Sequence, residues 1–239
     1  MNPPERTFFN WSTGKDSALA LYYLLQDDRY EVARLVTTVN SYYNRISMHG
    51  LSRTLLERQV RAIGIPLITI ELPKQPSMEE YENAMRENLQ QLRSEGFSIA
   101  AFGDIFLEDL REYREKQLER VGFRACFPIW KSNTRELIRQ FIEMGFRAIV
   151  VSIDAQLLDA SFAGREIDSQ FPDDLPPGVD PCGENGEFHA FCYDGPIFNQ
   201  PVEFSLGDLI YKEYPAPNKD GEQGNNPNMG FWFRDLLAR

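Results

Sequence analysis

The stretch Phe8-Phe9-Asn10-Trp11-Ser12-Thr13-Gly14-Lys15-Asp16-Ser17 joins an apolar run, a turn of small residues and the start of a helix. The small side chains at 12–14 let backbone N–H groups approach a ligand closely. The amphipathic run at 18–25 follows at once and predicts a helix whose N-terminus favours an anion. Lys15 adds a cation. The stretch therefore predicts a strand, a phosphate-binding loop and a helix.

The loop does not fit the P-loop of nucleoside triphosphatases. That motif needs Gly five residues before the Gly-Lys pair and Ser or Thr after the Lys, where this chain has Phe9 and Asp16. Ser12-Thr13-Gly14-Lys15-Asp16-Ser17 instead resembles the Ser-Gly-Gly-Lys-Asp-Ser pattern of the pyrophosphatase-type loop, or PP-loop, of the adenine nucleotide α-hydrolase superfamily. The resemblance implies cleavage of ATP between its α and β phosphates, with an adenylate and pyrophosphate as products. A plain capped helix start is the structural alternative.

Composition predicts a globular protein and opposes binding to nucleic acid through charge alone. The 239 residues, 42% of them hydrophobic, are enough for a packed core. The net charge of −11, from 36 acidic and 25 basic residues, opposes sequence-independent contact with a polyanion. The chain has no apolar run of about 18 residues, and its first residues do not resemble a signal sequence. We therefore expect no membrane partner and a cytoplasmic location.

Apolar and amphipathic segments alternate along the first two thirds of the chain. We expect strands at 8–11, 32–39, 67–72, 98–105, 124–130 and 147–153, and helices at 18–25, 51–63, 77–93, 107–121 and 134–144. Ser77 and Glu80, three residues apart, form a capping-box pattern at the start of the helix at 77–93. This alternation predicts an α/β fold with a doubly wound parallel sheet, adenine nucleotide α-hydrolase-like, that binds ligands at the carboxyl edge of its strands.

The pattern changes after about residue 155. The apolar runs on either side of Asp194-Gly195 predict strands of a smaller C-terminal α+β domain. The Gly- and Asn-rich segment 218–228 predicts a loop or lid, with Phe231-Trp232-Phe233 anchoring the end of the chain. We therefore divide the chain into an ATP-binding α/β domain at 1–130 and a substrate-binding α+β region at 131–239.

A second polar cluster lies in this C-terminal region. It reads Gly183-Glu184-Asn185-Gly186-Glu187-Phe188-His189 and is followed by Asp194-Gly195-Pro196-Ile197-Phe198. The glycines bracket a turn that presents two carboxylates and an amide before a strand carrying His189. Two polar, glycine-framed clusters in one chain are more readily explained as two walls of one site than as separate features.

The phosphate loop together with the second cluster resembles the diphthine–ammonia ligase family of ATP pyrophosphatases. Other matches follow in order: Met48-His49-Gly50, Gln59 leading into Gly64-Ile65-Pro66-Leu67, Gly103-Asp104-Ile105 with Asp109 and Arg111, and Pro128-Ile129-Trp130. Each is weak alone, but the ordered set is specific and spans roughly residues 7 to 205. Two residues depart from the family pattern. Thr13 replaces a Gly, which is tolerable only if this position does not need a positive φ, and Ala190 replaces the usual Thr.

The resemblance implies a role for each matched residue. The nucleotide would be held by Ser12, Thr13, Gly14, Lys15, Asp16, Ser17, His49 and Gly103, and Mg²⁺ by Asp16 and Asp104. The acceptor would be bound by Asp109, Arg111, Gly183, Glu184, Asn185 and His189. Catalysis would fall to Lys15, Asp16, Asp104, Glu184 and Glu187, with Lys15 neutralising the departing pyrophosphate.

Several of these residues also have a structural interpretation. Asp16 could simply cap its helix, and Asp104 and Asp109 could be the solvated acidic start of a helix. A lone histidine is often a structural hydrogen-bonder, which applies to His49 and His189. Three cysteines without a Cys-x-x-Cys pair favour reduced thiols, and Cys182, His189 and Cys192 lack the regular spacing of a zinc site.

The resemblance implies an enzyme that uses ATP and Mg²⁺ to adenylate a carboxylate and then forms an amide with ammonia. In that family the acceptor is the diphthine side chain of a translation elongation factor. No glutaminase segment is visible, so ammonia would be free or delivered by a partner, and a homo-oligomer is left open. The alternatives are an adenine-nucleotide-binding module without ligase activity, which Thr13 and Ala190 favour, or an ATP pyrophosphatase acting on a different acceptor.

Overall fold

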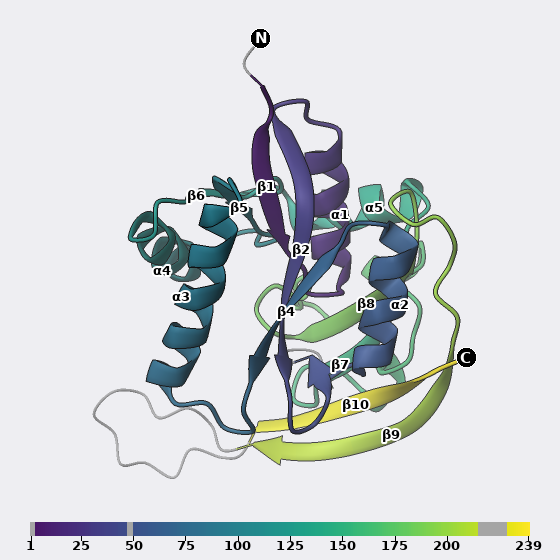
Figure 1. Ribbon diagram of the computed structural model, residues 1–239. Helices are drawn as coiled ribbons and strands as arrows, with labels where there is room; N and C mark the ends of the chain where they lie inside the picture. The colour runs from purple at the N-terminus through teal and green to yellow at the C-terminus, as the bar shows by residue number, and fades with distance from the viewer. Residues whose placement is uncertain (1–2, 47–49, 215–228) are drawn as a thin grey trace.

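The computed structural model describes residues 3–46, 50–214 and 229–239 (Figure 1). The N-terminal half forms a curled sheet, sheet A, with strand order β3-β2-β1-β5-β6 and with β4 paired to β2. Its strands are β1 (Glu5–Asn10), β2 (Tyr30–Asn40), β3 (Arg45–Ile46), β4 (Leu67–Leu72), β5 (Ile99–Ala101) and β6 (Arg124–Cys126). Within the described residues these strands pair in parallel, apart from the short antiparallel pairing of β2 with β3. The predicted parallel α/β sheet is confirmed.

Helices cover both faces of sheet A (Figure 1). They are α1 (Lys15–Leu25), α2 (Arg53–Ile63), α3 (Met78–Ser94), α4 (Glu108–Glu119) and α5 (Thr134–Glu143). Side chains alternate along a strand, so the adjacent residues Phe8 and Phe9 enter different cores: Phe8 packs with α3 and α4, and Phe9 packs with α1, α2 and α5. The sheet is therefore doubly wound, as the alternating pattern predicts. The predicted capping box of Ser77 and Glu80 starts α3.

The C-terminal half forms a separate antiparallel sheet, sheet B, with strand order β8-β7-β10-β9. Its strands are β7 (Arg147–Asp154), β8 (Phe188–Asp194), β9 (Phe204–Tyr214) and β10 (Met229–Ala238), and the short helices η1 (Ala160–Phe162) and α6 (Phe171–Asp174) lie between β7 and β8. The segment Phe231-Trp232-Phe233 lies in β10, paired with β7 and β9, and so anchors the chain end as expected. The loop predicted at 218–228 lies outside the described residues.

Two expectations for this region are wrong. The strand at 147–153 was expected to continue the parallel alternation, but it is β7, which is buried along nearly its whole length because β8 and β10 flank it in sheet B. The apolar run after Gly195 is not a strand; β9 begins only at Phe204. Gly195 has a φ of +142°, and Pro196 and Pro201 lack the N–H groups that a sheet needs, so the chain turns instead.

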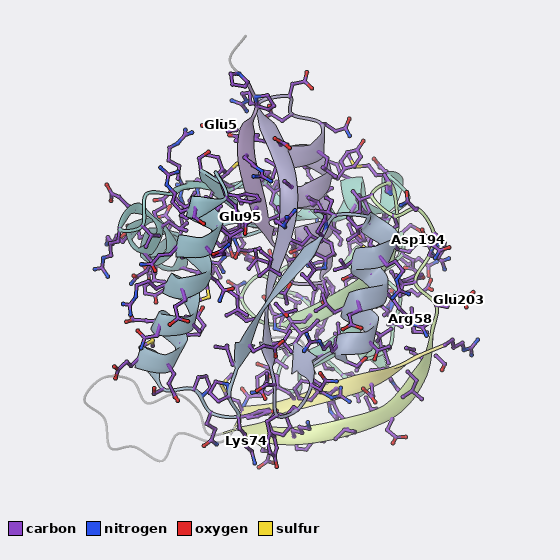
Figure 2. All side chains as sticks on the ribbon, in the orientation of Figure 1. Glu5, Arg58, Lys74, Glu95, Asp194 and Glu203 are labelled. Atoms are coloured by element: carbon purple, nitrogen blue, oxygen red, sulfur yellow. The ribbon has the colours of Figure 1, made fainter. Side chains whose placement is uncertain are left out.

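One hydrophobic cluster joins the two sheets. It contains Phe9 and Leu21 from the sheet A side together with Phe141, Phe188 and Phe191. Charged side chains such as Lys74 and Glu203 lie at the periphery instead (Figure 2). The proposed division of the chain at residue 130 stays a prediction.

Gln59 is a polar residue inside this shared core and hydrogen-bonds to several segments of the chain. Its side chain is fully buried, its Oε1 accepts a hydrogen bond from Trp11 Nε1 at 2.7 Å, and its Nε2 donates to the carbonyls of Thr13 at 3.0 Å and Cys192 at 2.6 Å. It thus joins α2 to the phosphate loop and to β8. This explains why a glutamine occupies the buried face of a helix.

We expect Gln59→Leu to lower the free energy of unfolding by about 3 kcal/mol, because it leaves a buried N–H and two buried carbonyls without this partner. Urea unfolding measures the change. The matched control is Gln91→Leu on the exposed face of α3, which should change stability by less than about 0.5 kcal/mol. Equal effects of the two substitutions would contradict the structural role of Gln59.

Candidate active site

The predicted phosphate loop lies where β1 ends and α1 begins, at the carboxyl edge of sheet A. The Ser17 hydroxyl oxygen accepts hydrogen bonds from the Ser12 backbone N–H at 3.1 Å and from the Ser12 hydroxyl at 2.9 Å. The Gly14 N–H points at the Ser12 oxygen at 3.3 Å. The two serines therefore close the loop around the N-terminus of α1.

Thr13 has a φ of +73°, in the left-handed region that favours glycine. We expected Thr to replace the family Gly without cost only if this position did not need a positive φ. It does have a positive φ, and the backbone is therefore strained by about 1–3 kcal/mol. The position is fixed from outside, since the Thr13 carbonyl accepts hydrogen bonds from Gln59 Nε2 and from the Cys192 N–H. The departure from the family glycine is therefore structurally accommodated but strained.

Gly103 brings the end of β5 against this loop. A Cβ atom at Gly103 would lie 3.0 Å from the backbone N and Cα of Ser17, closer than side chains normally approach. A glycine is therefore required for the close contact, and the residue after it, Asp104, is held beside the start of α1.

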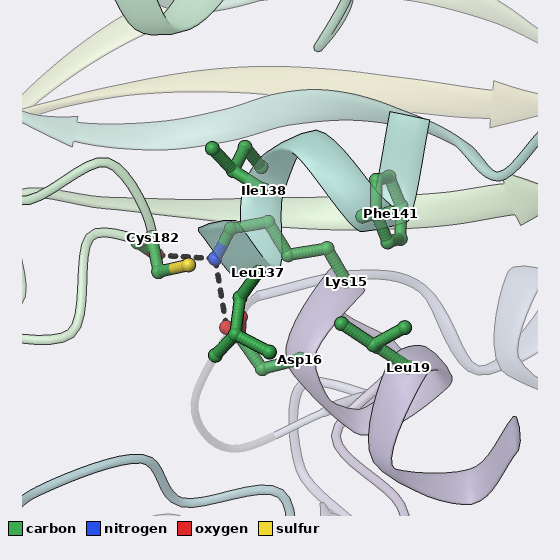
Figure 3. Close-up of a pocket in the computed structure, with 7 residues that line it drawn as sticks. All are labelled: Lys15, Asp16, Leu19, Leu137, Ile138, Phe141 and Cys182. Atoms are coloured by element: carbon green, nitrogen blue, oxygen red, sulfur yellow. Dashed lines mark hydrogen bonds and ion pairs between the residues drawn. The ribbon is translucent and has the colours of Figure 1, made fainter. Parts of the chain in front are cut away.

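Lys15 is almost fully buried, with 4% of its side chain exposed. Its ammonium forms an ion pair with Asp16 Oδ2 at 2.7 Å and donates a hydrogen bond to the carbonyl of Cys182 (Figure 3). It also lies 5.1 Å from the centre of the Phe188 ring. Burial disfavours its charge, but the carboxylates of Asp16 and Glu184 outweigh burial and raise the pKa of Lys15. Lys15 is therefore a buried cation held between two parts of the fold.

The space around Lys15 is closed on its other side by apolar residues of α1 and α5. Leu19, Leu137, Ile138 and Phe141 line it together with Lys15, Asp16 and Cys182, and it leaves no room for a water molecule (Figure 3). A ligand can reach the Lys15 amine only if these groups or the 180–187 loop move.

Carboxyl groups surround this cation. Burial raises the pKa of Asp16, which Lys15 opposes, and also raises the pKa of Asp104, with the Asp16 charge adding to the effect. Glu184 Oε1 accepts a hydrogen bond from the Ile105 N–H at 2.8 Å, and burial together with Asp16 and Asp104 raises its pKa to about 7. The structure therefore brings Lys15, Asp16, Asp104 and Glu184 together, and the prediction that the second cluster faces the phosphate loop is confirmed.

Asp104 and Asp16, the two residues of the predicted Mg²⁺ site, lie near enough for the Asp16 charge to affect the pKa of Asp104. Asp104 Oδ2 is buried and lies 3.1 Å from Arg114 Nη1, but it has no hydrogen-bond partner within the part of the chain that the structure describes. Carboxylate oxygens suit Mg²⁺, which commonly binds one or two carboxylates and completes its shell with phosphate and water. A set of three or more potential ligands for a metal is not found within the described ranges. These two residues therefore fit Mg²⁺ only if a nucleotide supplies further ligands.

Glu187 points into its own loop instead of toward Lys15. It is 3% exposed, and its carboxylate accepts hydrogen bonds from the Asp180 N–H at 3.0 Å, the Asn185 N–H at 2.9 Å and Asn185 Nδ2 at 3.0 Å. Gly183 has a φ of +70°, and a Cβ there would lie 2.7 Å from the Phe188 carbonyl. Both residues shape the turn that presents Glu184.

We expect Glu187→Gln to lower the free energy of unfolding by about 1–3 kcal/mol, because an amide NH₂ would replace an oxygen that accepts a hydrogen bond from a backbone N–H. Urea denaturation measures the loss. Glu143→Gln, at an exposed position of α5, is the control and should be nearly neutral. An unchanged unfolding midpoint in the Glu187 variant would contradict this role.

The remaining candidate residues differ from one another in burial and in position. His189 is partly buried in β8, and burial together with the Lys15 charge lowers its pKa to about 4, so its imidazole is neutral at pH 7. Asp109 is exposed in the first turn of α4. Arg111 lies over the rings of Phe127 and Trp130, with its guanidinium 5.0 and 4.7 Å from their centres. His49 lies outside the described residues.

Cys182 and Cys192 are buried free cysteines. Burial raises the pKa of Cys182 and of Cys192, so both are protonated at neutral pH. The described residues contain no group of three or more His, Cys, Asp or Glu side chains placed to hold a metal ion, so the alternative of a Cys182, His189 and Cys192 site gains no support.

Sequence reasoning missed three residues that hold this site together. Asp180 accepts hydrogen bonds from the N–H groups of Cys182 and Glu184, Thr134 donates its hydroxyl to Asp180, and Arg114 pairs with Asp104. The only available signal was Asp180-Pro181 directly before the glycine-framed cluster, since an Asp at that place favours a turn. Thr134 and Arg114 lie in ordinary helical patterns.

Two family models match the chain. The diphthamide synthase N-terminal domain matches residues 5–125, and the diphthamide synthase C-terminal domain matches residues 133–214. The chain belongs to the diphthamide synthase family. The two matched ranges contain the phosphate loop and the second cluster respectively, so the family assignment covers both walls of the site.

Curated relatives agree with the family. The chain is 29% identical to the diphthine–ammonia ligase of Bos taurus and 28% identical to that of Homo sapiens, each over 122 residues that make up 48% of this chain and 44% of the relative. The match to the diphthine–ammonia ligase of Schizosaccharomyces pombe is 25% identical over 119 residues, 44% of this chain and 20% of the relative. The matched segment thus spans less than half of each relative. Among the described helices, none has the length and apolar character needed to cross a bilayer.

Proposed function

We propose that this chain is an ATP-dependent ligase that adenylates a carboxylate and joins it to ammonia. The observation that carries the proposal is the meeting of the phosphate loop with the 180–187 loop at one buried cation, Lys15, which is surrounded by the carboxyl groups of Asp16 and Glu184. A cation at the start of a helix suits phosphate, and a carboxyl group poised near neutral pH suits proton transfer.

In the first step a carboxylate oxygen of the acceptor attacks the α-phosphorus of ATP, the α–β bond breaks, and pyrophosphate leaves. Ser12, Gly14 and Ser17, whose N–H and hydroxyl groups hydrogen-bond to one another in this structure, would turn these donors toward the phosphates. Lys15 would exchange the Cys182 carbonyl for pyrophosphate oxygens and so stabilise the charge that develops on the leaving group. Mg²⁺, held by Asp16 and Asp104, would supply additional positive charge for the phosphates.

In the second step the nitrogen of ammonia attacks the acyl carbon of the adenylate, a proton leaves the nitrogen, and AMP departs. Glu184 is the residue suited to accept that proton, because its pKa is raised to about 7 and its Oε1 is fixed by the Ile105 N–H. His189 stays neutral and can donate or accept a hydrogen bond without adding a charge.

The acceptor we propose is the diphthine side chain of a translation elongation factor, in keeping with the name diphthine–ammonia ligase that the relatives carry. Arg111 and Asp109 on α4 would contact this acceptor, with Gly183 and Asn185 shaping the opposite wall. The chain would act in the cytoplasm with free or delivered ammonia.

The test is pyrophosphate release from ATP in the presence of Mg²⁺, ammonium and a diphthine-bearing elongation factor, with each component omitted in turn. We expect release only in the complete mixture, and amide formation on the factor by mass spectrometry. Release that continues without the factor would point to another acceptor. The alternative, a nucleotide-binding module without ligase activity, has the strained Thr13 and the Ala190 substitution in its favour; it predicts ATP binding with no pyrophosphate under any condition.

A further inference from the structure

Asp180 lies at the centre of a hydrogen-bond network that joins α5 to the 180–187 loop and includes no residue of the phosphate loop. Its Oδ1 accepts hydrogen bonds from the N–H groups of Cys182 at 2.9 Å and Glu184 at 3.3 Å. Its Oδ2 accepts the hydroxyl of Thr134, the first residue of α5, at 2.7 Å. The carboxylate thus ties both ends of a short turn to a helix.

The same turn is attached to α5 a second time. The Cys182 thiol donates a hydrogen bond to the Thr134 carbonyl at 3.3 Å, and the Asp180 N–H donates to Glu187 Oε1 at 3.0 Å. The carbonyl of Cys182 and the side chain of Glu184, which both face the Lys15 cluster, therefore take their positions from Asp180 and Thr134.

We propose that Asp180, fixed by Thr134, is a positioning residue that holds the 180–187 loop closed over Lys15. The inference rests on the proposed function for its kinetic part and deepens it. When Asp180 is in place, the Cys182 carbonyl competes with phosphate for the Lys15 amine, while Glu184 is aimed at the acceptor. Loss of the Asp180 hydrogen bonds would free the Lys15 amine but misplace Glu184. The affinity for ATP and the turnover of the acceptor should therefore respond differently. Substitution of a residue that only stabilised the fold would lower both ATP affinity and acceptor-dependent turnover.

The experiment compares Asp180→Ala and Thr134→Val with Thr134→Ser, which keeps the hydroxyl. Backbone amide hydrogen exchange reports on residues 182–187 in the free protein, and calorimetry with magnesium ATP gives the nucleotide affinity. Pyrophosphate release with the diphthine-bearing elongation factor gives turnover. The matched control is Asp173→Ala. Asp173 lies in α6, and its exposed carboxylate is 3.2 Å from Arg135, the residue after Thr134 in α5.

We expect exchange at 182–187 to become at least about tenfold faster in Asp180→Ala and Thr134→Val, and acceptor-dependent turnover to fall about tenfold to a hundredfold, because small displacements of a reacting group are costly. The dissociation constant of ATP should stay within about twofold of wild type or become smaller, because Lys15 loses a competitor. Thr134→Ser and Asp173→Ala should behave as wild type.

The proposal is overturned if exchange in the loop is unchanged, or if ATP affinity falls in step with turnover. Should the wild-type chain release no pyrophosphate, the proposed function fails, and the exchange rates still decide whether Asp180 holds the loop. The two failures are therefore distinguishable.

Discussion

Lys15→Met should reduce pyrophosphate release by about 10²–10³, the usual effect of removing one positioned charge or donor from a transition state. Methionine keeps the length of the side chain and can pack against Phe188 and the apolar residues of α5, so the fold should survive. The measurement is the rate of pyrophosphate release at saturating ATP and acceptor, with circular dichroism as the check on folding.

Lys116→Met is the matched control for this substitution. Lys116 is 70% exposed on α4 and pairs only with Glu112 among the described residues, so its loss should leave turnover within about twofold. Normal ATP turnover in the Lys15 variant would show that the loop does not bind the phosphates that react.

Glu184→Gln should remove the acidic limb of the pH profile. In the wild type, at a fixed concentration of free NH₃, turnover should rise about tenfold per pH unit up to about pH 7 and then level off, because only the ionised carboxylate can accept a proton from ammonia. Glutamine still accepts the Ile105 hydrogen bond but cannot take the proton, so we expect turnover to fall about 10²-fold or more. Turnover of the two proteins between pH 5 and 9, roughly spanning that pKa, tests this.

Glu143→Gln should keep the wild-type profile, since that side chain is exposed on α5. ATP affinity should be nearly unchanged in Glu184→Gln, because the proposed mechanism assigns this carboxylate to the acceptor and ammonia, not to the nucleotide. A large loss of ATP affinity would place Glu184 on the nucleotide, and a retained acidic limb would assign the titration to another group.

Sequence alone determined the elements whose signals are local. The order β1, loop, α1 followed from one apolar run and one small-residue turn, and the cap of α3 followed from Ser77 and Glu80. Both are governed by backbone geometry within a few residues, so neighbouring side chains are sufficient to specify them. The ordered motifs also sufficed to indicate the family, because several weak matches in one order are specific together.

Tertiary structure decided what depends on partners far away in the chain. Whether 147–153 joined the parallel sheet depended on β8 and β10, which are distant in sequence, and periodicity within the segment carries no information about them. The two glutamates of the second cluster look equivalent in sequence, yet Glu187 satisfies the N–H groups of its own turn while Glu184 reaches Ile105. Burial beside Asp16 then raises the pKa of Glu184, because a charge loses hydration and meets a like charge only once the chain is folded.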